Sequence, residues 1–395
     1  MDSALKRQET PAPSPESLIA AARGLVPYLR GQAGACESAR RVSSETIARL
    51  HEAGLFNVPK PRRYGGYQMG WDVFSEIIMT VASGCGSSGW IYGVVGAHAA
   101  VVARFGVTLM DEIWLPNPNA LISSCRRGAG ILERVEGGFR GTLKGMFSSG
   151  CLNADWVIID GAPVAGEERP LTVVVPMSQV EVLDTWRVMG LAGTGSNDLI
   201  AHDVFIPEHR TWFPGKAPHG GGVDGAIFRT PFLGGPLSLP SVVLGVALGG
   251  LELFSQATAV RASSRGGGAV ADLQSMQIRI GESALEIDAA RSLVRAKLRD
   301  WMAQQGAPVS DGLLPAGGAA PDYDQGVAAF VANSGYNALN RLMSAAGANQ
   351  LALSEPFQRC FRDALAGAQQ PSNNWDNGRT VAGRRILDTY RSAKV

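Results

Sequence analysis

Helical and strand-like hydrophobic patterns occupy separate stretches of this 395-residue chain. From Pro15 to about Trp114, apolar residues recur at helical spacing, as in "SSETIARLHEAGL". From about Asn117 to Trp212 the chain breaks into short apolar runs such as "DWVIIDGAP" and "LTVVVPM", which Gly, Pro, Asn and Asp separate. Helical spacing resumes at Ser241. Because helix and strand do not alternate, the order excludes a dinucleotide-binding βαβ domain and predicts an α+β fold.

The same patterns predict how the chain divides. "VEGGF" indicates a hairpin turn between two of the strands. Short strands at regular spacing favour a barrel or sandwich, and long helices with mixed faces favour a bundle. We therefore expect a disordered N-terminus over 1–16, an α-helical domain over 17–116, a β-barrel or sandwich domain over 117–215, a linker over 216–239, and a C-terminal four-helix bundle with a tail over 240–395.

Composition removes several classes of function. A net charge of +1 argues against nucleic acid as the main partner, because no broad basic excess is present. The five cysteines lack a C-x-x-C spacing, which indicates reduced thiols. No apolar run reaches the length of a membrane span, and the polar start has no apolar signal core, so we expect a cytoplasmic protein. The dispersed histidines predict no metal site.

The stretch "WRVMGLAGTGSNDLIAHDVFIP", residues 186–207, looks at first like a phosphate-binding loop. A P-loop would end in Lys followed by Ser or Thr, and a dinucleotide fingerprint would run into a helix. Here the glycines lead into residues 199–206, which are rich in β-branched side chains and stop at Pro207, so they predict a strand. From the residues alone, a plain connecting turn and a nucleotide contact through Thr194 or Ser196 explain the stretch equally well.

Several segments together resemble the acyl-CoA dehydrogenase fold. They are "LHEAGLFNVPKPRRYGGY", "GCGSSGWIYGVVGAH", "FSSGCLNADWVI", "WRVMGLAGTGSNDLIAHDVFIPEHR" and "SEPFQRCFRDA". More narrowly, they are similar to its flavin-dependent monooxygenase branch, the oxygenase components of two-component hydroxylases. The resemblance covers nearly the whole chain. It implies a flavin held between the middle β-domain and the helical domains, a separate flavin reductase, and a homotetramer assembled through the C-terminal bundle.

The resemblance also implies a reaction. Reduced flavin (FADH2 or FMNH2) would react with O2 to form a C4a-hydroperoxide, which would hydroxylate a small phenol- or indole-like substrate. Donors near the flavin N5 would slow the loss of this species as hydrogen peroxide. An acyl-CoA dehydrogenase is a weaker alternative, because "LAGAQQPSNNWDNGRT" has no Glu where family dehydrogenases carry their base. An N-oxygenase of an amine or amino sugar and a non-catalytic flavin-binding relative also stay open.

Site residues follow from the same resemblance. It implies catalytic roles for His98, Ser124, Ser149 and Gln370, where Gln370 (or Gln369) stands in place of a histidine of phenol-hydroxylating relatives. Gln cannot act as a base, so the residue favours indole-like or amine substrates over simple phenols that must lose a proton. Without the resemblance, a satisfied core histidine, turn serines and packed tryptophans would explain most of these residues. The residues expected against the flavin are Trp90, Ser148, Ser149, Trp156, Thr194, Ser196 and Arg265.

Overall fold

The computed structural model describes residues 13–229, 235–262, 268–306 and 325–392. Its N-terminal part is helical, as expected. Ser14 and Ser43 begin the first two helices, since their hydroxyls accept hydrogen bonds from the Ser17 and Thr46 amides. Ser43 is the first residue of the segment "SSETIARLHEAGL" that predicted this helix. The helices are α1 (Pro15–Ala39), α2 (Ser44–Glu52), α3 (Trp71–Gly84), α4 (Gly86–Val95), α5 (His98–Val102) and α6 (Val107–Trp114).

The middle of the chain forms one seven-stranded sheet in the order β5-β6-β2-β1-β3-β4-β7. The expected hairpin joins β1 to β2, with Gly137 at φ 78° in its turn. Residues 197–207 form a strand, as predicted from their β-branched content. The strands are β1 (Ile122–Val135), β2 (Gly138–Ser149), β3 (Trp156–Ala162), β4 (Leu171–Pro176), β5 (Glu181–Leu183), β6 (Asn197–Pro207) and β7 (Thr211–Trp212).

Alternation along the strands gives this sheet two apolar faces. In β3, Val157 and Ile159 belong to a core that the sheet encloses itself, whereas Ile158 packs into the large core of the helices. Strands β4 and β6 contact each other although they are not hydrogen-bonded neighbours, so the sheet folds over its own core. The barrel or sandwich expected from the sequence is thus a single curved sheet, and helices cover its second face.

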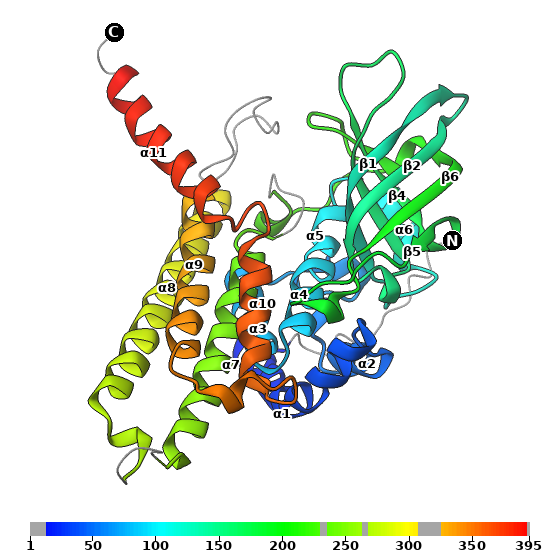
Figure 1. The fold of residues 1–395 in the computed structure, drawn as a ribbon. Coiled ribbons are helices and arrows are strands. Elements are labelled where there is room, and N and C mark those ends of the chain that lie inside the picture. Colours follow the sequence, from blue (N-terminus) through cyan, green and yellow to red (C-terminus); the bar gives the residue numbers. More distant parts are fainter. Residues whose placement is uncertain (1–12, 230–234, 263–267, 307–324, 393–395) are drawn as a thin grey trace.

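The C-terminal part contains five helices in the described residues, one more than the expected four. They are α7 (Ser238–Val260), α8 (Gln274–Gly306), α9 (Gln325–Met343), α10 (Pro356–Ala368) and α11 (Trp375–Ser392). Helix α7 begins at Ser238, two residues before the expected start of the bundle at residue 240. Helix α11 projects beyond the other four (Figure 1). The helical pattern from Ser241 to Gln304 is therefore two helices, α7 and α8, with a break between them.

Helix α7 is the centre of this bundle. It contacts α3, α4, α8, α9 and α10. By length and composition it is the one described helix apolar enough to cross a membrane, but 67% of its most apolar window is buried inside the protein. Its hydropathy is that of a core helix. Helices α4 and α5 lie between the bundle and the sheet, so the two cores meet around them (Figure 1).

Candidate active site

A cavity of about 640 Å³ lies where the sheet, α4, α5 and the ends of α7 and α10 come together. This volume is within the range of small-molecule and cofactor sites. The main side chains around it are aromatic or carry hydroxyl and carboxamide groups. The lining consists of Trp90, Gly93, Val94, His98, Ser124, Cys125, Arg126, Phe147, Ser149, Asp160, Trp186, Leu191, Thr194, Ser196, Gly235, Ser238, Leu239, Ala366, Gln369, Gln370, Pro371 and Ser372.

Most of the residues singled out from the sequence meet at this cavity. Its lining includes Trp90, His98, Ser124, Ser149, Thr194, Ser196 and Gln370. Two expected flavin contacts do not line it. Ser148 is fully buried and its hydroxyl donates to Ser123 Oγ at 3.4 Å, and the ring of Trp156 lies under the Arg210 guanidinium at 5.1 Å. Arg265 lies outside the described residues.

Three hydroxyls on the sheet side, those of Ser149, Thr194 and Ser196, form a chain that we call the hydroxyl wall. Thr194 Oγ1 donates to the Leu191 carbonyl at 2.8 Å, and this uses its only proton. Ser196 must therefore donate to Thr194, and Ser149 must donate to Ser196, each at 2.8 Å. Trp90 Nε1 donates to Ser149 at 3.1 Å. Every proton of the chain runs in one direction, from the Trp90 indole to the Leu191 carbonyl.

This direction decides what the hydroxyl wall offers a ligand. A hydroxyl has one proton and two lone pairs. Because all three protons are used inside the chain, only lone pairs are left for the cavity. The sequence analysis expected hydroxyl donors beside the flavin N5. The structure instead gives Ser149 as an acceptor, which suits a ligand N–H.

The Leu191 peptide anchors the hydroxyl wall. Its carbonyl also accepts from Thr194 N and from Trp186 Nε1, both at 3.1 Å, and its N–H donates to Asp363 Oδ1 at 2.6 Å. Leu191 has φ 54°, in the left-handed region. Burial raises the pKa of the Asp363 carboxyl to about 7. Helix α10 thus holds the turn that carries Thr194 and Ser196.

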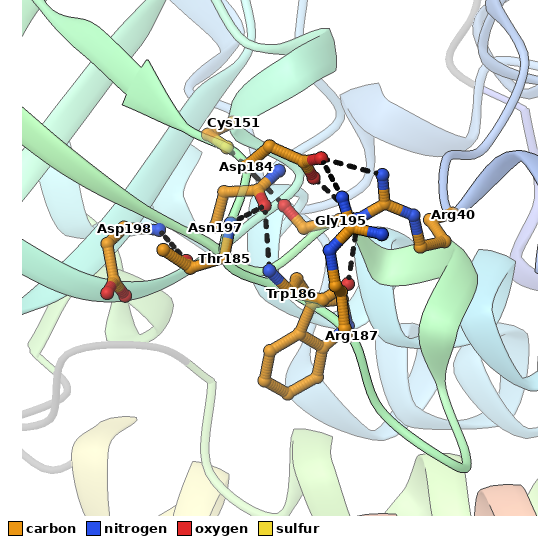
Figure 2. A network of polar contacts seen from close by, with 9 residues as sticks. All are labelled: Arg40, Cys151, Asp184, Thr185, Trp186, Arg187, Gly195, Asn197 and Asp198. Atoms are coloured by element: carbon orange, nitrogen blue, oxygen red, sulfur yellow. Dashed lines mark hydrogen bonds and ion pairs between the residues drawn. The ribbon is translucent and has the colours of Figure 1, made fainter.

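A second network fixes Trp186 at the start of the same segment (Figure 2). Its backbone N–H donates to Asn197 Oδ1 at 3.1 Å, and its carbonyl accepts from Arg40 Nη1 at 3.2 Å. Arg40 is held in turn by Asp184. The Trp186 ring meets Phe147 edge to face, with ring centroids 6.2 Å apart. The glycine-rich stretch is therefore an anchored loop that presents an aromatic ring to the cavity, and no helix N-terminus follows it to hold a phosphate.

His98 contributes a hydrogen-bond acceptor to the same cavity. Its Nδ1 lies 2.7 Å from the Ile122 carbonyl, and since a carbonyl only accepts, Nδ1 carries the proton. Burial lowers the pKa of His98 to about 4, so the ring is neutral at neutral pH. Nε2 is then left with a free lone pair. The lone histidine of the apolar helix is a cavity residue whose tautomer the Ile122 carbonyl determines.

On the bundle side, Gln370, Ser372 and Ser238 form what we call the carboxamide wall. Gln370 Oε1 accepts from Ser372 N at 2.6 Å and from the Ser372 hydroxyl. Ser238 stands at the first position of α7, is 4% exposed, and its hydroxyl has no hydrogen-bond partner. These groups belong to segments far apart in the sequence.

Several lining residues were not among the candidates from the sequence: Arg126, Phe147, Asp160, Trp186, Ser238 and Ser372. Phe147 and Trp186 stand in the segments "FSSG" and "WRVMG" that carried the resemblance, so these segments could have indicated them. Ser238 and Ser372 belong to no recognisable pattern. Only tertiary packing brings them to the cavity.

The charged lining is sparse. Arg126 and Asp160 are paired residues of neighbouring strands, and the Asp160 carboxylate accepts from Thr172 Oγ1 at 2.7 Å. Asp160 is the only carboxylate in the lining described here. Among the described residues, no group of three or more His, Cys, Asp or Glu side chains could hold a metal ion. The one carboxylate that could act as a base for acyl-CoA desaturation is therefore Asp160, which stands on β3 and already accepts a hydrogen bond from Thr172.

The lining fits a flavin. Trp90, Phe147 and Trp186 supply flat apolar surfaces for an aromatic ring system, and the hydroxyl wall supplies acceptors for a ring N–H. We assign these residues as the ones that would hold it.

Comparison with known proteins identifies the family of the chain. The model of the acyl-CoA dehydrogenase N-terminal domain matches residues 21–118, and that of the C-terminal domain matches residues 237–375. The chain is 32% identical to the oxygenase component of the FADH(2)-dependent resorcinol hydroxylase of Rhizobium sp. strain MTP-10005, over 94% of each chain. It is 30% identical to the oxygenase component of p-hydroxyphenylacetate 3-hydroxylase of Acinetobacter baumannii, over 96% of this chain and 91% of that one.

A solved structure gives the same answer at the level of the fold. The HsaA monooxygenase of M. tuberculosis superposes with a TM-score of 0.83 at 29% identity, covering 95% of this chain and 98% of that one. By sequence, this chain is 32% identical over 93% of its length to HsaA of M. tuberculosis, which is named as the oxygenase subunit of a flavin-dependent monooxygenase. The chain therefore belongs to the acyl-CoA dehydrogenase superfamily, in the branch of flavin-dependent monooxygenases, and is an oxygenase component that uses reduced flavin.

Proposed function

We propose that this oxygenase component hydroxylates a small aromatic ring that carries an acidic O–H or N–H, such as a phenol or an indole. The observation that carries the proposal is the neutral His98, whose Nε2 lone pair lies in the same cavity as the hydroxyl wall. A ring O–H or N–H that donates to Nε2 gains electron density, which favours attack by the ring on an electrophilic oxygen. The flavin supplies that oxygen when bound, as a C4a-hydroperoxide formed with O2.

The residues of the chain have separate tasks in this proposal. The hydroxyl wall accepts from a flavin N–H and keeps the flavin edge oriented. Trp90 and Trp186 cover the ring and exclude water. His98 orients the substrate by accepting a hydrogen bond from its O–H or N–H. A separate reductase supplies the reduced flavin, as the words "oxygenase component" in the names of the relatives suggest.

The printed names of relatives support an aromatic substrate. They include hydroxylases of resorcinol and p-hydroxyphenylacetate, and an indole-3-acetate monooxygenase of Pseudomonas putida that is 29% identical over 69% of this chain. No described contact favours the amine N-oxygenase. For assembly we propose a homotetramer through the bundle, where apolar side chains of α8 and α11 such as Leu285, Ile386 and Leu387 are more than half exposed.

Stopped-flow absorbance tests the reaction. The protein is mixed with reduced FMN or FAD under nitrogen and then with oxygenated buffer. A long-lived absorbance of a C4a-hydroperoxyflavin, which phenols or indoles make decay faster with formation of hydroxylated product, is the expected result. Direct reoxidation of both flavins without an intermediate, together with no product from any aromatic, would contradict the proposal. Reduction of the oxidised flavin by an acyl-CoA thioester under nitrogen would identify a dehydrogenase instead.

A further inference from the structure

Gln370 has a fixed orientation that the mechanism above does not use. The Ser372 amide N–H and the Ser372 hydroxyl both point at one atom of the Gln370 carboxamide. A backbone N–H only donates, so the atom that it contacts must be the carboxamide oxygen. This contact settles the choice between the two orientations of the amide. The oxygen is used by Ser372, and the NH2 group is left without a hydrogen-bond partner among the described residues.

The position of Gln370 directs this NH2 group. Gln370 and Ser372 both line the cavity, at the end of α10, and the turn that they form is closed by a bond from Asn373 N to the Gln370 carbonyl at 2.8 Å. The neighbouring start of α7 adds a second unused group, the Ser238 hydroxyl, which is buried without a partner. The buried Ser238 hydroxyl needs an acceptor that the described residues do not supply, and the half-exposed Gln370 NH2 group can donate to a ligand or to water. No carboxylate or carbonyl of the described chain meets them there.

We propose that Ser372 locks the Gln370 carboxamide as a donor, and that the carboxamide wall selects substrates with a hydrogen-bond-accepting oxygen on the ring or on a short substituent. This inference rests on the proposed aromatic substrate and deepens it. His98 Nε2 accepts a hydrogen bond from the substrate, and the Gln370 NH2 group donates one to a substrate oxygen. The cavity therefore recognises one donor and one acceptor of the substrate. Ser372 is a positioning residue, since it acts through Gln370.

The physical reason for selectivity is the cost of an unmet donor. When a ligand without an acceptor displaces water from the Gln370 NH2 group, that group loses its hydrogen bonds and gains none. A matched ligand pair therefore isolates the effect. The ethyl group of 4-ethylphenol is close in shape to the acetyl group of 4-hydroxyacetophenone, but it lacks the oxygen. The corresponding pair, 3-ethylphenol and 3-hydroxyacetophenone, places the substituent at the meta position of the ring.

The experiment measures dissociation constants of these four phenols by calorimetry, under nitrogen, with reduced flavin bound to the protein. In the wild type we expect one acetyl compound to bind about tenfold more tightly than its ethyl partner. Gln370→Glu keeps the shape but turns an acceptor toward the cavity, since Ser372 N still holds one oxygen. It should abolish or reverse the preference. Ser372→Ala removes the hydroxyl contact to Gln370 Oε1. Its preference for the acetyl compound should lie between that of the wild type and that of Gln370→Glu.

A control and the contrary outcomes complete the test. Gln274→Glu places the same charge at an exposed position at the start of α8, outside the cavity lining, and should keep the preference for the acetyl compound. Equal affinities within both pairs in the wild type, or a preference that Gln370→Glu leaves intact, would overturn the inference while the aromatic substrate stands. If none of the four phenols binds the wild type, both this inference and its phenol basis fall. The stopped-flow experiment decides separately whether the protein is an oxygenase.

Discussion

The hydroxyl wall and the carboxamide wall face the same cavity but use their donors differently. All protons of Ser149, Ser196 and Thr194 are used within the protein, in a chain that ends at Leu191. Across the cavity, the Gln370 NH2 group and the Ser238 hydroxyl have no hydrogen-bond partner within the described part of the chain. A wall whose donors are satisfied keeps its shape with or without a ligand, whereas a wall with unmet donors is completed by one. The hydroxyl wall therefore suits the flavin, which is the same molecule in every turnover, and the carboxamide wall suits the substrate.

His98→Asn should have the largest effect. The shorter side chain removes Nε2, the atom that accepts a hydrogen bond from the substrate in the proposed function. We expect kcat/KM for a phenol substrate to fall about 100-fold, because the substrate loses the hydrogen bond that orients it and increases the electron density of its ring. Reduced flavin would still react with O2, so the yield of hydrogen peroxide per flavin should rise. Product and peroxide are measured together in a coupled assay. A loss of less than about threefold would exclude His98 as the group that accepts this hydrogen bond from the substrate.

Asp363 tests the anchor of the hydroxyl wall through pH. Its folded-state pKa of about 7 lies above the ordinary aspartate value of 3.8, so between these two pH values the folded protein holds a proton that the unfolded chain releases. The stabilisation is complete below pH 3.8 and is lost as the pH rises through 7. Relative to Asp363→Asn, the wild-type free energy of unfolding should therefore fall across this window, by at most about 4 kcal/mol.

Urea unfolding of both proteins between pH 4 and 8 measures that difference. His98 titrates in the opposite sense, since its folded pKa of about 4 lies below 6.5, but it is present in both proteins and cancels. A difference that is constant with pH would show that the Asp363 carboxyl ionises in the folded protein as it does in the unfolded chain.

Gly193→Ala should disturb the hydroxyl wall from behind. A Cβ at this position would lie 2.3 Å from Cys36 Sγ and 3.0 Å from the Cys36 carbonyl oxygen, so the turn could not pack on α1 without a backbone shift. We expect a loss of about 1–3 kcal/mol in stability and weaker flavin binding, measured by thermal unfolding with and without flavin. Gly281→Ala, in α8, is the matched control: its Cβ meets nothing within 4 Å, and it should be neutral or slightly stabilising.

Ser149→Ala should act mainly on the coupling of flavin oxidation to product formation. It leaves the buried Trp90 indole N–H without its acceptor, at a cost of about 1–3 kcal/mol at most. It also removes the lone pair offered to the flavin, so more hydrogen peroxide should form per reduced flavin consumed. Ser148→Ala is the control, because Ser148 does not line the cavity. Equal hydrogen peroxide yields from Ser149→Ala and Ser148→Ala would show that the hydroxyl wall does not control the loss of peroxide.

The sequence predicted the fold better than the details of the site. Segregated helical and strand patterns sufficed for the α+β order, because each pattern is local. The strand at 199–206 and the hairpin at Gly137 followed from β-branched residues and a turn signal. Helix α11 was missed as a separate element, since its side chains are largely exposed and its apolar spacing is weak.

For the site, residue identity was easier to predict than polarity. His98 and Ser149 stood in recognisable segments, and both line the cavity. That Ser149 is an acceptor depends on Thr194 reaching the Leu191 carbonyl, and that Gln370 is a donor depends on Ser372. Such directions come from counting protons in three dimensions. Trp156 shows the converse, because an aromatic residue in a fitting segment packs against Arg210 instead.

The peptide of Leu191 also limits how such proteins can be recombined. Its N–H is held by the C-terminal bundle through Asp363, and its carbonyl is held by Trp186 and Thr194 of its own loop. The neighbouring Trp186 carbonyl depends on Arg40 of the N-terminal region. A chimera that moves only the middle region of this chain into a homologue would therefore carry the loop without the two residues that hold it here, Arg40 and Asp363. Transfer of the cavity between homologues requires Arg40 and Asp363 to move together with residues 186–196.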